Sequence, residues 1–122
     1  MFNIKTDIEK NRLYIFMGNL EKGKDFGKFL SEIEKAVRFL KQGFSCISDL
    51  RGFKFEDSSH HFMQSVQETL WDAGVKLAIR IVDENSGKQF CFEEQSMVWP
   101  AYKIKIAFAR KEAEAILDKR GL

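Results

Sequence analysis

The sequence predicts a single α/β domain over residues 1–122, with helices packed on a mixed β-sheet. Two patterns predict this class. The amino-terminal residues alternate between apolar and polar side chains as strands do, and the later residues switch between short apolar runs and stretches with helical spacing. A length of 122 residues suits one domain, and 44% hydrophobic with 31% charged residues is an ordinary globular balance. The 12 phenylalanines indicate a core rich in aromatic rings.

The amino-terminal residues predict a β-hairpin with its turn at residues 9–11. The second strand is apolar on both faces, so we expect it inside the sheet rather than at an edge. One face of the first strand carries Phe2, Ile4, Thr6 and Ile8. The second strand comprises Leu13, Tyr14, Ile15, Phe16 and Met17.

With the hairpin included, the predicted order of elements is β-β-α-β-α-β-(α)-β-α, a mixed sheet with helical crossovers. Because each later strand returns through a helix, those strands should be parallel. The bracketed helix is expected at residues 88–92, and Asp25 is the expected N-cap of the first helix. The expected helices cover residues 26–40, 59–73 and 109–120. The expected strands cover residues 44–50, 75–82 and 102–108, of which the last should lie at an edge.

Charge and composition exclude several classes of function. The formal net charge is +2 and basic residues are interspersed with acidic ones, so we expect no nucleic-acid partner. The sequence has no apolar run of membrane-spanning length and no signal peptide, so we expect a cytoplasmic protein without a membrane span. Cys46 and Cys91 are expected as reduced, small apolar residues on or near strands. No cofactor motif is present, and no cofactor is expected.

An apolar strand, a turn and an Asp-Ser-Ser triplet that opens a helix follow one another over residues 47–59. This segment and the order of elements resemble the STAS domain, the SpoIIAA-like fold of anti-sigma-factor antagonists. Residues 43–50, 72–76 and 113–117 look most like bacterial SpoIIAA-like (STAS/SEC14-type) proteins of unassigned function. The resemblance implies that fold for a bacterial, regulatory protein, although this subgroup generally lacks the phosphorylatable serine.

The first candidate site is the expected helix start at Asp57, Ser58, Ser59 and His60. By the resemblance, Ser58 matches the serine that a partner kinase phosphorylates in regulatory members, whereas His60 stands where the family has glycine. A phosphate there would meet free backbone N–H groups and the positive end of the helix dipole. The simpler interpretation is that Asp57 or Ser58 caps the helix. His60 and His61 point about 100° apart on a helix, so we expect no metal site.

The second candidate is a polar or anion site formed by Asp49, Arg51 and Arg80. Asp49 and Arg51 end one expected strand, and Arg80 lies within the next. If these strands are neighbours, Asp49 and Arg80 could pair, and ligands of open α/β sheets bind outside such strand ends. The alternatives are a structural ion pair and a small anion held by Arg51 or Arg80.

The sequence contains no glycine-rich phosphate loop and no nucleophile–base arrangement, so we do not expect an enzyme. The first hypothesis is a non-enzymatic, STAS-like regulatory or protein-interaction domain whose partner, a kinase or a regulator, docks at residues 57–61. The alternative is a small-molecule or lipid-binding SEC14-like domain with a cleft between the phenylalanine-rich helices and the sheet. A large apolar pocket would favour the alternative, and a closed core the first hypothesis. Trp71 and Trp99 are expected in the core or half-buried, and an exposed one could anchor a partner.

Overall fold

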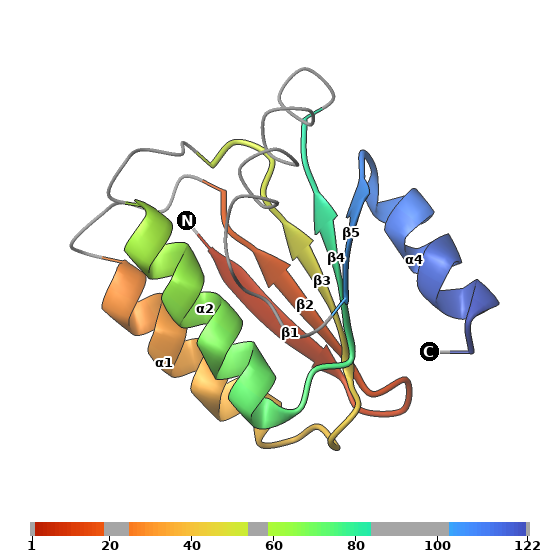
Figure 1. Ribbon diagram of the computed structural model, residues 1–122, viewed down its shortest axis with the longest axis horizontal. Helices are drawn as coiled ribbons and strands as arrows, with labels where there is room; N and C mark the ends of the chain where they lie inside the picture. The colour runs from red at the N-terminus through yellow and green to blue at the C-terminus, as the bar shows by residue number, and fades with distance from the viewer. Residues whose placement is uncertain (1, 19–24, 54–58, 84–102, 122) are drawn as a thin grey trace.

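A five-stranded mixed β-sheet organises the chain (Figure 1). The computed structural model describes residues 2–18, 25–53, 59–83 and 103–121. Strands lie in the order β1-β2-β3-β4-β5, with β1 antiparallel to β2 and every later pair parallel. The strands are β1 (Asn3–Asp7), β2 (Arg12–Phe16), β3 (Ser45–Asp49), β4 (Leu77–Ile81) and β5 (Lys103–Ala107). The α/β class, the hairpin, the interior place of β2 and the edge place of β5 are confirmed. The helix expected at residues 88–92 lies outside the described residues.

Helices cover both faces of the sheet. Helices α1 (Phe26–Val37) and α2 (Ser59–Ala73) lie together on one face, and α4 (Arg110–Lys119) lies on the other (Figure 1). Contacts join α1 to α2 and to β1, whereas α4 contacts β3, β4 and β5. We call these two sides of the sheet the α1/α2 face and the α4 face.

The hairpin turn begins one residue earlier than its sequence indicates. Ile8 was expected to extend the first strand, but it lies in the turn with 64% of its surface exposed. The Asn11 N–H donates to the Ile8 carbonyl at 3.2 Å, and the Lys10 N–H donates to the Asp7 carboxylate at 3.1 Å. Asn11 adopts a φ of 53°, a left-handed conformation that asparagine tolerates better than most residues. The local turn therefore overrides the alternation that placed Ile8 on the strand.

Helix α2 has the bounds that its sequence predicts, whereas α1 ends earlier than its apolar spacing indicates. Helix α2 begins and ends where predicted, and Gly74 follows it with a φ of 96°. Helix α1 ends at Val37 rather than at Leu40, because the Phe39 and Leu40 N–H groups bond three residues back and tighten the last turn. Asp25 holds the expected N-cap position, but its side chain makes no capping hydrogen bond.

The connections at the amino ends of the parallel strands are hydrogen-bonded to one another. The Asn11 side chain accepts from the Lys41 N–H at 2.8 Å and donates to the Lys41 carbonyl at 3.1 Å. The Gly43 N–H donates to the Gly74 carbonyl at 2.7 Å. A Cβ at Gly74 would collide with the side chain of Gln42, so this glycine also allows a close approach. The turn of the hairpin and the connections before β3 and β4 are therefore joined by hydrogen bonds along one end of the sheet.

Aromatic rings fill the space between the helices and the sheet on the α1/α2 face. Phe29 is fully buried, and its ring centroid lies 5.3 Å from that of Phe2 and 5.5 Å from that of Phe62. Phe26 stacks on Phe62 at 3.8 Å. Strand residues on this face complete the core, including Leu13, Ile15, Cys46 and Ala78. A second, smaller cluster on the α4 face comprises Ile47, Leu77, Ile79, Ile81, Ala107, Ala113 and Leu117.

The two phenylalanines Phe29 and Phe39 provide a matched test of this packing. Replacing the buried ring in Phe29→Ala should lower the free energy of unfolding by about 3–5 kcal/mol, through lost burial and a residual cavity. The same change at Phe39, which is 66% exposed, should alter it by less than about 0.5 kcal/mol. Urea denaturation of both variants measures the difference. Equal losses would contradict the packing described here.

Candidate functional site

Side chains on the α4 face stand in rows that cross the sheet. In the parallel and antiparallel ladders, Tyr14 lies opposite both Lys5 and Ile47, and Phe16 lies opposite both Asn3 and Asp49. The same register sets Asp49 beside Ile81 on β4. Because residues two apart share a face, these two rows lie one above the other at the carboxyl ends of β2, β3 and β4.

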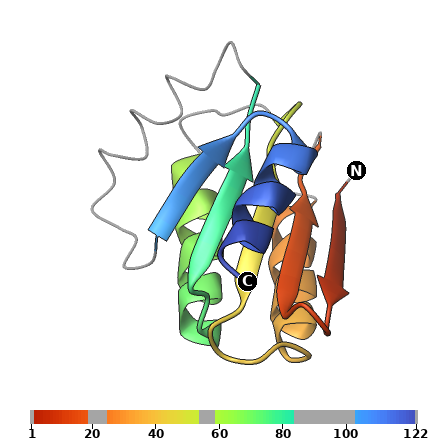
Figure 2. The same cartoon turned by 90° about the vertical axis from the view of Figure 1, so that its right-hand side faces the viewer.

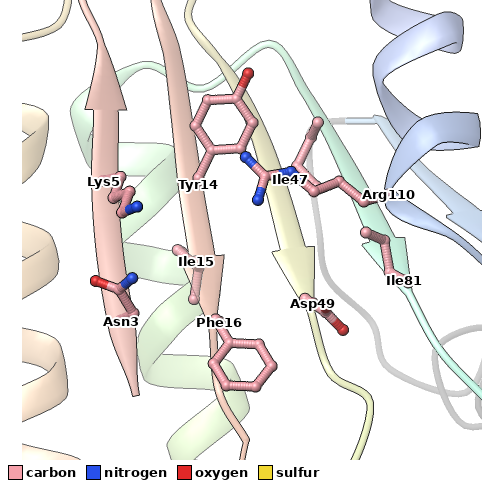
Figure 3. Close-up of a pocket in the computed structure, with 9 residues that line it drawn as sticks. All are labelled: Asn3, Lys5, Tyr14, Ile15, Phe16, Ile47, Asp49, Ile81 and Arg110. Carbon is pink, nitrogen blue, oxygen red and sulfur yellow. The ribbon is translucent and has the colours of Figure 1, made fainter.

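Helix α4 covers only part of this face. It lies in front of β3 and leaves β1 uncovered in the view of Figure 2, in agreement with its contacts to β3, β4 and β5. A cavity of about 230 Å³ opens beside its first residue, Arg110 (Figure 3). We call it the open-face pocket. Its lining consists of Asn3, Lys5, Tyr14, Ile15, Phe16, Ile47, Asp49, Ile81 and Arg110.

A buried arginine fixes α4 over the sheet. Arg12, the first residue of β2, is 1% exposed, and its guanidinium donates to Glu114 at 2.7 Å and to Asp118 at 3.1 Å. Burial alone lowers the pKa of Arg12, but hydrogen bonds with Tyr14, Asp118 and Glu114 outweigh it and raise the pKa. The side chain therefore stays charged, and it needs both carboxylates of α4 to offset its desolvation.

Arg12, Glu114 and Asp118 form a cluster that we call the clamp, and Tyr14 links it to the pocket. Its hydroxyl donates to the Glu114 carboxylate at 2.7 Å, and the Arg110 guanidinium lies 4.9 Å from its ring centroid. Burial raises the pKa of Tyr14, and the hydrogen bond to Glu114 raises it further. The ring is therefore held in place by its hydroxyl while one side of it faces the pocket.

The structure joins two members of the predicted polar site and separates the third. Arg51 donates to the Asp49 carboxylate through Nε at 2.9 Å, Nη2 at 2.8 Å and its backbone N–H at 3.1 Å. The hydrogen bonds to Asp49 raise the pKa of Arg51. Arg80 instead lies beside Ser48 in the β3–β4 ladder and therefore faces the α1/α2 side. The alternative pairing of Asp49 with Arg80 thus gives way to a local Asp49–Arg51 pair.

Arg80 lies in a buried polar group with Cys46 and Ser48 on the α1/α2 face. Arg80 is 4% exposed and Ser48 is 6% exposed, and the Cys46 sulfur lies 3.5 Å from the Ser48 hydroxyl. Complete burial raises the pKa of the Cys46 thiol to about 11, although Ser48 and the charge of Arg80 act against it. Cys46 is thus a protonated thiol within the core, as its position on a strand indicated.

The first predicted site falls largely outside the described residues. Asp57 and Ser58 are not described, and Ser59 and His60 are described only as the first residues of α2. His61, the next residue, is exposed. Within residues 2–18, 25–53, 59–83 and 103–121, no group of three or more His, Cys, Asp or Glu side chains could hold a metal ion. No helix in these same ranges is long and apolar enough to cross a bilayer.

No protein-family model matches the chain, and no curated protein matches it either. The STAS resemblance therefore remains an expectation from the sequence, whereas the α/β class is a property of the structure.

Of the residues that line the open-face pocket, only Asp49 was identified as part of a site from the sequence. The alternation of the hairpin does place Lys5 and Asn3 on the face shared by Tyr14 and Phe16. No pattern in the sequence indicates that Arg110, the first residue of α4, reaches the same place.

The clamp can be tested at Glu114, the carboxylate that accepts hydrogen bonds from two side chains. Glu114→Gln removes the charge that accepts hydrogen bonds from both Arg12 and Tyr14, and it should lower the free energy of unfolding by about 1–3 kcal/mol. Glu9→Gln makes the same chemical change in the exposed hairpin turn and should be nearly neutral. Chemical denaturation of the two variants at neutral pH provides the comparison. A stable Glu114→Gln protein would mean that the clamp does not hold α4.

The raised pKa of Tyr14 predicts a pH effect above pH 10. Tyr14 stabilises the fold as a neutral donor, so its contribution is complete below its usual pKa of 10.0 and is lost as the pH rises through the higher folded-state value. The tyrosinate absorbance of the wild type minus that of Tyr14→Phe should therefore titrate above pH 10. The stability difference between the two proteins should shrink over the same interval. A difference titration at or below pH 10 would refute the assigned hydrogen bond.

Proposed function

We propose that the chain is a non-enzymatic, STAS-like domain that acts by binding a protein partner along α2. The observation that carries the proposal is Trp71, which was expected in the core or half-buried but is 42% exposed on this helix. Tryptophan is among the residues that most often anchor protein interfaces, because a large ring is buried there at little entropic cost.

The exposed side of α2 extends from Trp71 back to the motif that suggested the family. His61, Gln64, Glu68 and Trp71 are all exposed, and their spacing of three and four places them on one side of the helix. The same helix begins at Ser59, directly after Ser58. A partner that lies along α2 would therefore also reach the predicted phosphorylation site, which is how a phosphate could control the interaction.

The closed core supports this proposal over the lipid-binding alternative. A SEC14-like cleft would lie between the phenylalanine-rich helices and the sheet, and there Phe26, Phe29 and Phe62 pack against one another. Phe29 and Phe62 are 0% and 5% exposed. The rings that suggested a ligand cleft are thus used to pack the helices.

Site-specific photo-cross-linking in the cells that make the protein tests the proposal. A photoreactive phenylalanine at position 64, beside Trp71 on the exposed side of α2, should yield a protein adduct of one defined mass. The same group at the exposed Glu34 of α1 should not. Trp71→Ala should lower the adduct yield about tenfold, as expected for an interface anchor, whereas Phe39→Ala, another exposed ring, should leave it unchanged.

An adduct that persists in Trp71→Ala would contradict an interface along α2, and a cross-linked lipid in place of a protein would favour the alternative function. Phosphopeptide analysis of the same preparations, with Ser58→Ala as the control, tests the regulatory part. Phosphate on Ser58 supports a kinase-switched domain, and an unmodified serine supports its interpretation as a helix cap.

A further inference from the structure

We propose that the open-face pocket binds a small organic carboxylate, whose charge lies between Lys5 and Arg110 and whose apolar part lies against Tyr14 and Phe16. This site lies on the α4 face, on the opposite side of the sheet from α2. It is independent of the protein interface proposed above (Figures 2 and 3).

The first argument is the balance of charge around the pocket. Lys5 reaches it from β1 and Arg110 from the start of α4, on either side of Tyr14 (Figure 3). Among residues 2–18, 25–53, 59–83 and 103–121, the ion pairs involve Arg12 and Arg51 but neither Lys5 nor Arg110. Two cations without carboxylate partners at one cavity favour an anion there.

The carboxylates near the pocket do not cancel this charge. Asp49 lines the pocket, but Arg51 holds both of its oxygens at 2.8 and 2.9 Å. Glu114 is engaged by Arg12 and Tyr14. Glu112, in the first turn of α4, accepts a hydrogen bond from the Phe108 N–H at 3.2 Å. Asp49 and Glu114 are thus each paired with an arginine, and none of these three acids forms an ion pair with Lys5 or Arg110.

The second argument is the apolar part of the lining. Ile47 and Ile81 line the pocket but are only 2% and 0% exposed, whereas the ring of Phe16 beside them is 43% exposed and offers apolar surface to a ligand. A ligand that covers this ring removes apolar surface from water, which free inorganic phosphate cannot do. The lining therefore favours an organic acid with a flat or branched hydrocarbon part over a bare inorganic anion.

The third argument is size and position. A cavity of about 230 Å³ is smaller than the 300–1,000 Å³ pockets that hold drug-sized ligands, so the ligand should be small. Its walls include the last residues of β2, β3 and β4, namely Phe16, Asp49 and Ile81. The carboxyl ends of parallel strands are the usual binding position of open α/β sheets.

Benzoate is the probe that tests all three arguments, because it combines one carboxylate with one flat apolar ring. In titrations of the full chain followed by NMR, benzoate should shift the amide signals of Phe16, Asp49 and Ile81 in a saturable way. The dissociation constant should be roughly millimolar, as suits so small a ligand. Benzamide, which has the same shape without the charge, and inorganic phosphate, which has charge without the ring, should each bind about tenfold more weakly or not at all.

Charge-matched variants locate the site. Lys5→Gln and Arg110→Gln should each weaken benzoate binding about tenfold, since each removes one charged donor to the carboxylate. Lys10→Gln in the hairpin turn and Lys111→Gln beside Arg110 make the same change at exposed positions outside the lining, and they should leave binding unchanged. Thermal unfolding of every variant confirms that it is folded.

Three results would overturn the proposal. Benzoate that produces no saturable shift shows that the pocket does not take a carboxylate. Equal binding of benzamide or of phosphate shows that charge or the apolar lining plays no part. Equal weakening by Lys111→Gln and Arg110→Gln shows that general surface charge, and not the pocket, attracts the anion. Trp71→Ala should bind benzoate normally, so a failure here is distinct from a failure of the protein interface along α2.

Discussion

The buried guanidinium of Arg12 is the interaction on which the arrangement of the α4 face depends. A charge that is 1% exposed is stable only if partners offset its desolvation, and α4 supplies two carboxylates, Glu114 and Asp118, that pair with it. The requirement fixes the position of α4 relative to β2, and therefore also the position of Arg110 at its first turn. The shape of the open-face pocket follows from this placement.

The two faces of the sheet are closed in different ways. On the α1/α2 face, phenylalanine rings fill the space beneath two helices, and the surface available to a partner is the outer side of α2. On the α4 face, one ten-residue helix contacts β3 to β5, and Asn3 and Lys5 of β1 and Phe16 of β2 stay exposed to solvent. The interface proposed along α2 and the ligand site proposed in the open-face pocket would therefore lie on opposite sides of one scaffold.

Local patterns in the sequence were sufficient to predict the elements, but they could not predict how distant residues meet. The bounds of α2 were predictable because an apolar stripe ends at Gly74, and the interior place of β2 was predictable because it is apolar on both faces. Ile8 was misplaced because its alternation continues into a turn that Asn11 closes. The relation of Asp49 to Arg80 depends on a one-residue register, which decides whether two side chains share a face.

The side of the sheet that α4 covers could not be predicted at all. The stripe of Ala113 and Leu117 indicates one buried face of this helix, but β3 and β4 carry apolar residues on both sides, so the sequence does not indicate which side the helix covers. Arg12 determines which side of the sheet α4 covers. In the sequence, however, Arg12 looks like an ordinary charged residue at the end of a turn. The open-face pocket was missed for the same reason, since Lys5 and Arg110 become neighbours only once α4 is placed.

The hydrogen bonds between the connections at the amino ends of the parallel strands have an evolutionary consequence. There the hairpin turn holds the connection before β3 through Asn11 and Lys41, and that connection holds the next through Gly43 and Gly74. Inserting a residue into any one of these connections would break bonds made by its neighbour, so an insertion has to be compensated in two places at once. We therefore expect homologous chains to keep these three connections at constant length. Their loop lengths and sequences should vary instead at the carboxyl ends of the parallel strands.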